Sequence, residues 1–98
     1  MEFHTPVLVK EVIEFLNIQK GEWYVDATAG GGGHTQAILD QGGCVLALDQ
    51  DDAAIKELNH RFTKELKKGT VKIKKSNFAS LKKAVTDSGL NQISGILF

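Results

Sequence analysis

Hydrophobic positions follow two alternating periods along the chain, and these periods predict helices and strands in turn. Apolar side chains return every three or four residues in the segments that we predict as helices, 5–20, 34–41, 51–69 and 80–88. Shorter apolar segments between them predict strands at 22–27, 44–49, 70–75 and 93–98. Because the two types alternate and short connections join them, the sequence predicts an α/β fold with a parallel sheet.

Two of the predicted strands carry different patterns. Residues 44–49 are apolar without alternation, which is typical of a strand that is buried on both faces. In 70–75, apolar residues alternate with lysines, which favours a strand at the edge of the sheet. The sequence therefore predicts which strand is central and which lies at the rim.

The predicted helices carry apolar stripes and capping residues. In the first helix the side chains expected to pack on the core are Leu8, Val12, Phe15 and Leu16. In the third helix they are Ile55, Leu58, Phe62 and Leu66. Polar residues at the helix starts predict caps at Thr5 (with Pro6 in the first helical position), at Asp51 or Asp52, and at Ser80.

The stretch Tyr24–His34 joins a predicted strand to a predicted helix through four consecutive glycines. Glycines let a ligand approach the backbone, and the free N–H groups at a helix start carry partial positive charge. Four glycines in a row have a large entropic cost, so a nucleotide or anion site is favoured over a merely tight turn. The sequence therefore predicts a ligand site at residues 26–34.

The glycine pattern also limits which ligand binds there. The dinucleotide fingerprint G-x-G-x-x-G/A fits neither register, because its third glycine falls on Thr35 or Gln36. No G-K-[ST] sequence is present to form a phosphate-binding P-loop. Asp26, just before the glycines, suits an ammonium group better than a polyphosphate. We therefore expect the amino-acid end of a molecule such as S-adenosylmethionine.

Further polar and aromatic residues follow the other predicted strands, at the edge where parallel α/β sheets bind ligands. Asp49 stands nineteen residues after Gly30, where a carboxylate accepts hydrogen bonds from ribose hydroxyls; otherwise it caps the next helix. Phe78 is placed to lie against a purine ring, or else fills the core. Asn77 is expected either to present its amide to the adenine edge of such a ligand or to form a turn.

His34 is a candidate ligand contact at the start of the helix after the glycines. Its backbone N–H or its ring would meet the carboxylate of the ligand; the alternative is a half-exposed residue at a helix start. No second ligand stands near it at a metal-binding spacing, so we expect no metal site.

Composition bounds the class of protein. The 98 residues allow at most one small domain, and 42% of them are apolar. No apolar run approaches the ~20 residues of a membrane span. The single cysteine, Cys44, agrees with a reducing compartment and is expected to pack as a small core residue. We therefore expect a cytoplasmic protein without membrane contact.

The net charge is zero, but the charges are unevenly distributed. Residues 1–60 carry ten Asp and Glu against three Lys, and residues 61–98 carry nine Lys and Arg against two acidic residues. The two parts thus have balances of −7 and +7. This asymmetry indicates a polyanionic partner or, equally well, a solvated helix end beside a charged edge strand.

Six segments in order resemble the N-terminal part of the bacterial ribosomal RNA small-subunit methyltransferase H family. They are His4–Val7, Tyr24–Thr28, Gly30–Thr35, Ala47–Asp51, Ser76–Ser80 and Gly95–Phe98. The resemblance implies a Rossmann-like class I methyltransferase sheet, S-adenosylmethionine as cofactor, and methylation at N4 of a cytidine in the 16S ribosomal RNA of the small subunit. It also implies cofactor contacts at Gly32, Gly33, His34, Asp49 and Phe78. It leaves the catalytic residue unknown.

In that family the fourth strand continues into an acidic residue and a loop with further cofactor contacts, followed by a helical insertion for RNA. This sequence ends at Phe98, one residue short of that acid. Residues 1–98 are therefore expected to be the incomplete N-terminal part of the methyltransferase domain, truncated after about four parallel strands and inactive alone. Residues 93–98 would form an exposed apolar edge, which predicts a homodimer through this strand.

Two other functions stay open when the residues alone are considered. One is an NAD-type nucleotide-binding domain, although the missing third glycine argues against it. The other is a non-catalytic oligomeric fragment that binds no ligand.

Overall fold

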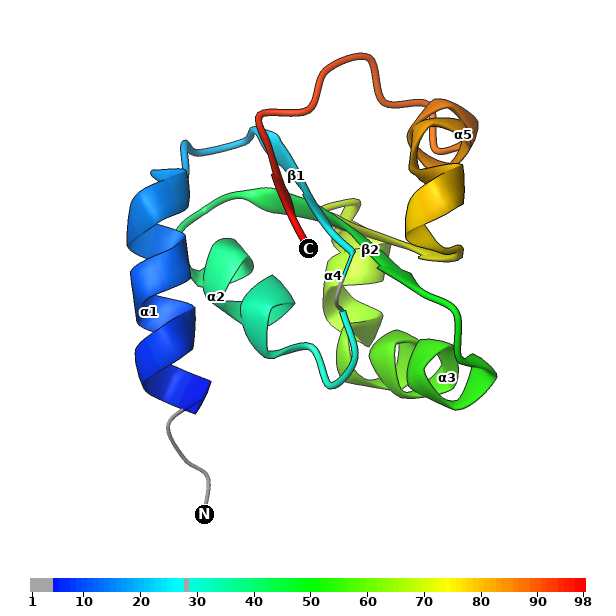
Figure 1. Ribbon diagram of the computed structural model, residues 1–98, viewed down its shortest axis with the longest axis horizontal. Helices are drawn as coiled ribbons and strands as arrows, with labels where there is room; N and C mark the ends of the chain where they lie inside the picture. Colours follow the sequence, from blue (N-terminus) through cyan, green and yellow to red (C-terminus); the bar gives the residue numbers. More distant parts are fainter. Residues whose placement is uncertain (1–4, 28) are drawn as a thin grey trace.

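Four parallel strands form the sheet that organises the chain (Figure 1). The computed structural model describes residues 5–27 and 29–98. The strands are β1 (Trp23–Asp26), β2 (Cys44–Asp49), β3 (Val71–Lys75) and β4 (Gly95–Leu97). Their order across the sheet is β3-β2-β1-β4, and every pairing is parallel. The predicted parallel α/β fold is confirmed, and β3 lies at an edge as its alternating lysines indicate.

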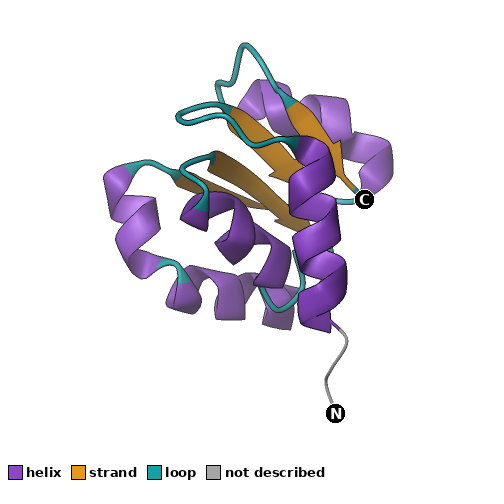
Figure 2. Cartoon of the chain, turned by 90° about the vertical axis from the view of Figure 1, so that its left-hand side faces the viewer, coloured by secondary structure: helices purple, strands orange, loops and turns teal. Residues whose placement is uncertain are grey.

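Within the described residues, helices cover the two faces of the sheet unequally (Figure 2). One face carries α1 (Thr5–Leu16), α2 (Gly33–Asp40), α3 (Asp52–Arg61) and α4 (Thr63–Lys68). The other face carries α5 (Leu81–Asp87), which follows a short 3-10 helix, η1 (Phe78–Ser80). None of these helices is long and apolar enough to cross a membrane.

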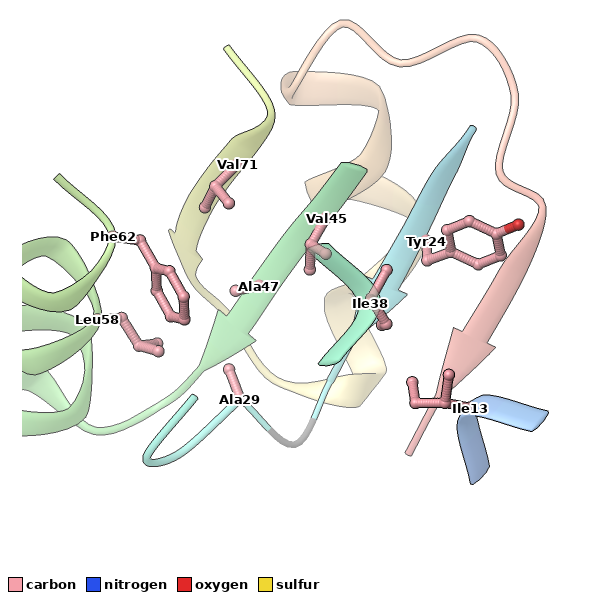
Figure 3. Packing of buried hydrophobic residues seen from close by; sticks show 9 residues of the cluster. All are labelled: Ile13, Tyr24, Ala29, Ile38, Val45, Ala47, Leu58, Phe62 and Val71. Carbon is pink, nitrogen blue, oxygen red and sulfur yellow. The ribbon is translucent and has the colours of Figure 1, made fainter. Parts of the chain in front are cut away.

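The two central strands are buried on both faces. Under α1 to α4, the sheet contributes Tyr24, Val45 and Ala47 to a large apolar cluster (Figure 3). Under α5, the sheet contributes Val25, Leu46 and Leu48 to a smaller cluster. This confirms the prediction for residues 44–49. Because both central strands are packed on two sides, the loops that follow them start from firmly held positions.

Helix α1 differs from its prediction in length and in orientation. It ends at Leu16 rather than near residue 20, because Asn17 adopts a left-handed φ of 53° that stops the helix. Ile13 is its buried residue, and Val9 and Leu16 pack against the same cluster. Phe15 is 90% exposed, so the prediction that it packs on the core is wrong. Val9, Ile13 and Leu16 are spaced by four and three residues, so they lie on one face of the helix, and this face packs on the core. Phe15 lies outside this face.

The predicted helix 51–69 is two helices that break at Phe62. This residue has φ −106° and ψ 32°, outside the helical region, and its side chain is fully buried. Next to it, the Thr63 hydroxyl donates to the carbonyls of Asn59 and His60, at 3.0 and 2.8 Å. These bonds compete with the backbone bonds that would continue the helix. The break therefore has both a local cause and a packing cause.

The predicted caps have mixed outcomes. The Asp51 carboxylate accepts a hydrogen bond from the Ala53 N–H at 3.2 Å, so this cap is confirmed. Ser80 makes no capping bond with its side chain; the prediction there is wrong. The Asn77 side-chain oxygen instead accepts from the Ser80 N–H at 3.0 Å, which closes the turn three residues earlier. The predicted cap at Thr5 concerns a side chain outside the described part of the structure.

Cys44 begins β2 as a free, half-buried thiol. Burial raises the pKa of this thiol above its ordinary value, because the thiolate would lose its hydration. A raised pKa leaves little of the reactive thiolate near neutral pH. Cys44 belongs to neither buried apolar cluster, so the prediction that it packs as a core residue is not confirmed.

Candidate cofactor site

The glycine stretch forms the loop between β1 and α2, at the carboxyl end of the sheet. Two of its residues, Gly30 and Gly32, have positive φ values of 42° and 89°. Residues with a Cβ rarely adopt this conformation, so the loop requires glycine at both positions. The Gly32 N–H donates to the Ala29 carbonyl at 2.6 Å, which makes the turn tight just before α2 begins. The sequence prediction of a strand, a glycine turn and a helix start is confirmed.

Asp49 connects this loop to the next strand. One of its carboxylate oxygens accepts from the Gly30 N–H at 3.0 Å, and the other accepts from the Asp51 N–H at 2.9 Å. The side chain is half-buried. The register of the sheet brings these groups together, because Asp26 of β1 lies beside Ala47 of β2. The structure thus places Asp49 against the glycine loop, and Asp51 rather than Asp49 caps α3.

Asp26 lies beneath the loop and not at its surface. Its side chain is fully buried, and one oxygen accepts a hydrogen bond from the Thr35 hydroxyl at 2.8 Å. The expectation that Asp26 faces an ammonium group of the ligand is therefore not supported. Sequence reasoning missed Thr35 as its partner, because it considered that position only as a missing third glycine. The pair joins the end of β1 to the first turn of α2.

The start of α2 faces open space. A methyl group added at Gly33 would meet no atom within 4 Å, and the same holds at Gly31. No side chain caps this helix, and its first N–H groups have no acceptor inside the helix. His34 follows as a half-buried residue of the first turn. Gly33 and His34 thus present backbone donors and the positive end of the helix dipole at this edge.

Phe78 lies at the same end of the sheet, after β3. Its side chain is 57% exposed, which contradicts the alternative that it fills the core. Its ring packs against that of Phe98, with ring centroids 4.8 Å apart. Because Phe78 follows β3 and Phe98 follows β4, this contact joins the segments that leave the two outer strands. Asn77 beside it serves the turn.

A cleft of about 420 Å³ lies beside these groups, between the loops after β2 and β3 and helix α5. Gln50, Asn77 and Lys83 are among its lining residues. Nearby, the Lys75 ammonium lies 2.9 Å from the Asp52 carboxylate. The hydrogen bond from Lys75 to Asp52, and the charge of that carboxylate, raise the pKa of the lysine. The cleft is thus lined by Gln50 and Asn77, the sequence neighbours of Asp49 and Phe78. No described residue of the glycine loop lines it.

Metal binding has no support in this part of the molecule. Among residues 5–27 and 29–98, no three His, Cys, Asp or Glu side chains are grouped so that they could hold a metal ion.

A family comparison decides what kind of protein carries this site. The sequence profile of the MraW methylase family matches residues 1–98, the whole chain. The chain belongs to the MraW methylase family. Curated relatives in this family are longer than the chain. "Ribosomal RNA small subunit methyltransferase H" of Carboxydothermus hydrogenoformans is 47% identical over 100 residues, which cover 99% of this chain and 31% of that protein.

A second MraW-family relative gives the same picture. The protein of the same name from Ruminiclostridium cellulolyticum is 41% identical over 101 residues, which cover 99% of this chain and 32% of that protein. The chain thus spans about a third of the length of the curated relatives it matches. The family resemblance seen in the sequence segments is confirmed.

Solved structures confirm the methyltransferase fold of this MraW-family chain. The C-terminal domain of precorrin-6Y C5,15-methyltransferase from Rhodobacter capsulatus matches with a TM-score of 0.71 at 13% identity, covering 83% of this chain and 45% of that one. A geranyl diphosphate methyltransferase, solved in complex with SAM, matches with a TM-score of 0.64 at 20% identity. It covers 72% of this chain and 29% of that one. At these identities the likeness establishes the fold alone.

Replacement of Thr35 by valine should destabilise the MraW-family chain. Valine keeps the shape but removes a donor to the buried Asp26 carboxylate, a loss of about 1.5–3 kcal/mol in the free energy of unfolding. Urea unfolding followed by circular dichroism measures it. The matched control is Thr86→Val, whose hydroxyl donates to the Lys82 carbonyl on an exposed helix surface. Equal effects of the two substitutions would contradict a special role for the Thr35–Asp26 pair.

Proposed function

We propose that residues 1–98 form the N-terminal, cofactor-binding part of an S-adenosylmethionine-dependent methyltransferase. Its target would be N4 of a cytidine in 16S ribosomal RNA. One observation carries this proposal: the glycine loop, the open start of α2 and the Asp49 carboxylate meet at the carboxyl edge of two central parallel strands. This is the edge where open α/β sheets bind nucleotides. The name of the curated relatives supplies the RNA substrate.

The loop and the start of α2 would hold the amino-acid tail of the cofactor. Its carboxylate matches the backbone donors of Gly33 and His34 and the positive end of the helix dipole. Gly32 lets the chain turn into the helix with its φ of 89°, and no side chain caps the helix start. The open space beside Gly33 allows the ligand to approach the backbone closely.

Asp49 would bind the ribose of the cofactor. Each carboxylate oxygen already accepts one backbone N–H, and each has capacity for a second bond. Two ribose hydroxyls can donate to these remaining positions. The exposed ring of Phe78 would lie against the adenine, which adds about 0.5–1.5 kcal/mol beyond burial when two rings stack.

Methyl transfer requires the cytidine amine to approach the donor in line. S-adenosylmethionine, when bound, supplies a methyl group on a positively charged sulfur. The exocyclic amine of cytosine is a weak nucleophile, so positioning by the residues around the site is the main contribution of the protein. We assign no catalytic residue within 1–98. The target base must leave its stack to reach such a site, and the full-length enzyme would act on ribosomal RNA in the cytoplasm.

We also propose that the chain forms a homodimer through β4. Within the described residues this strand pairs only with β1, so its outer edge is free. Beside it, α1 and β4 line an apolar hollow of about 390 Å³. Its exposed large apolar side chains are Phe15, Ile96 and Phe98, and the exposed Glu11 lies at its border. Two copies related by a two-fold axis can pair these edges antiparallel and cover both hollows, since such an interface is self-complementary.

Titration calorimetry should show that the chain binds S-adenosylmethionine and its demethylated product but not NAD. Asp49→Ala should weaken S-adenosylmethionine binding by about 1–3 kcal/mol, because ribose bonds are lost. Glu57→Ala, which removes an exposed carboxylate of α3, is the matched control. A 2′-deoxy analogue should lose affinity for the unmodified chain and lose none for Asp49→Ala. Binding of NAD instead would favour a dinucleotide domain, and binding of no ligand would favour a non-catalytic fragment.

The purified chain should not methylate 16S RNA or small ribosomal subunits. It covers about a third of the relatives' length, and we assign none of its described residues as the acceptor of the amine proton. Transfer of a radiolabelled methyl group from S-adenosylmethionine measures activity, with the Carboxydothermus hydrogenoformans relative as positive control. Detectable transfer by the chain alone would show that residues 1–98 are sufficient.

Sedimentation should detect a dimer at high concentration. Phe15→Ser should restore the monomer, because it removes an aromatic ring that is 90% exposed at the β4 side of α1. Glu57→Ser serves as the surface control and should leave the dimer intact. If the unmodified chain sediments as a monomer at every concentration, the proposed interface through β4 is ruled out.

A further inference from the structure

The junction between α3 and α4 lies directly behind the glycine loop. Phe62, at this junction, is fully buried and points into the apolar cluster together with Ala29 of the loop (Figure 3). A methyl group added at Gly32 would lie 2.8 Å from Cε2 of the Phe62 ring, closer than side chains tolerate. The loop backbone at Gly32 therefore packs directly against the Phe62 ring, and a side chain at this position would not fit.

Arg61, the last residue of α3, holds the same part of the loop from outside. Its Nη1 atom donates a hydrogen bond to the Gly31 carbonyl. The guanidinium also lies over the Phe62 ring, 5.2 Å from its centroid, an arrangement that favours a cation. A methyl group at Gly32 would lie 3.2 Å from this same Nη1 atom. The side chain is exposed, yet it is placed by two separate contacts.

These contacts clamp one peptide group at both ends. The peptide between Gly31 and Gly32 has its carbonyl held by Arg61 and its N–H held by the Ala29 carbonyl at 2.6 Å. A planar peptide group with both ends bonded cannot rotate without losing a bond. Its orientation fixes how the chain enters α2, and so where the donors of Gly33 and His34 point. The four glycines have no side chains of their own that could restrain the loop, so the restraint must come from other residues.

We propose that Arg61 is a positioning residue that preorganises the glycine loop for the amino-acid tail of the cofactor. This inference rests on the proposed function, which places that tail at the start of α2. Arg61 would act through the Gly31–Gly32 peptide, and it needs no contact with the ligand. Because a flexible loop pays ordering entropy on binding, the clamp raises affinity by removing that cost in advance.

The test compares ligands that contain the tail with one that lacks it. Arg61→Ala should weaken S-adenosylmethionine binding about tenfold, because the freed loop would then have to be ordered when the ligand binds. It should leave binding of 5′-methylthioadenosine, which has no amino-acid tail, unchanged. Arg61→Lys keeps the charge and one donor, and should recover part of the loss. Lys64→Ala, which removes a positive charge one turn further along, is the matched control and should bind both ligands normally.

A ligand-free measurement tests the clamp by itself. Nitrogen-15 NMR spectra of Arg61→Ala should show shifted or broadened amide signals for Gly31, Gly32 and Gly33, with signals of the central strands unchanged. Unchanged loop signals would overturn the inference, as would equal losses for both ligands or an equal effect of Lys64→Ala. Failure of the unmodified chain to bind S-adenosylmethionine would contradict the proposed function, and the loop signals would still decide whether Arg61 clamps the loop.

Discussion

The carboxylate of Asp49 is the contact on which the candidate site depends. It accepts the Gly30 N–H with one oxygen and the Asp51 N–H with the other, and so ties the glycine loop to the start of α3. The carboxylate can do this because β1 and β2 pair in parallel, with Asp26 beside Ala47. The loops after both strands then leave the sheet side by side. A one-residue shift in this register would separate the two ends of the bond.

A run of glycines would otherwise be the least ordered part of the molecule, because glycine loses the most conformational freedom on folding. Three contacts offset this in the structure. Asp49 holds the loop from β2, the Thr35–Asp26 pair holds it from below, and Arg61 with Phe62 supports it from the α3–α4 junction. The loop thus combines open space beside its backbone with a defined shape. Both properties are needed for a ligand to bind backbone donors without a large ordering cost.

The two edges of the sheet have opposite characters. At β3, lysines alternate with apolar residues and Lys75 pairs with Asp52, which are features that discourage edge-to-edge association. At β4, the strand has only three residues, and Phe15, Ile96 and Phe98 are exposed beside it. The positive balance of residues 61–98 comes mainly from α4, β3 and α5, which follow one another in the chain and include the edge strand β3. The β4 side is therefore the apolar side of the sheet.

The sequence by itself determined the order of helices and strands, the central position of β2 and the edge position of β3. These follow from local periodicity, which is a property of neighbouring residues. The sequence also predicted that Asp49, the glycine loop and Phe78 lie at one edge, because the carboxyl ends of parallel strands must share it. Contacts of these residues and of His34 with a cofactor stay a prediction. Only the tertiary structure decided that Phe15 faces outward, that Asp26 is buried against Thr35, and that the long helix breaks at Phe62. It alone brought Arg61 to the Gly31 carbonyl, thirty residues away in the chain. Contacts of this kind depend on how elements pack in three dimensions, and no periodicity within a single element encodes them.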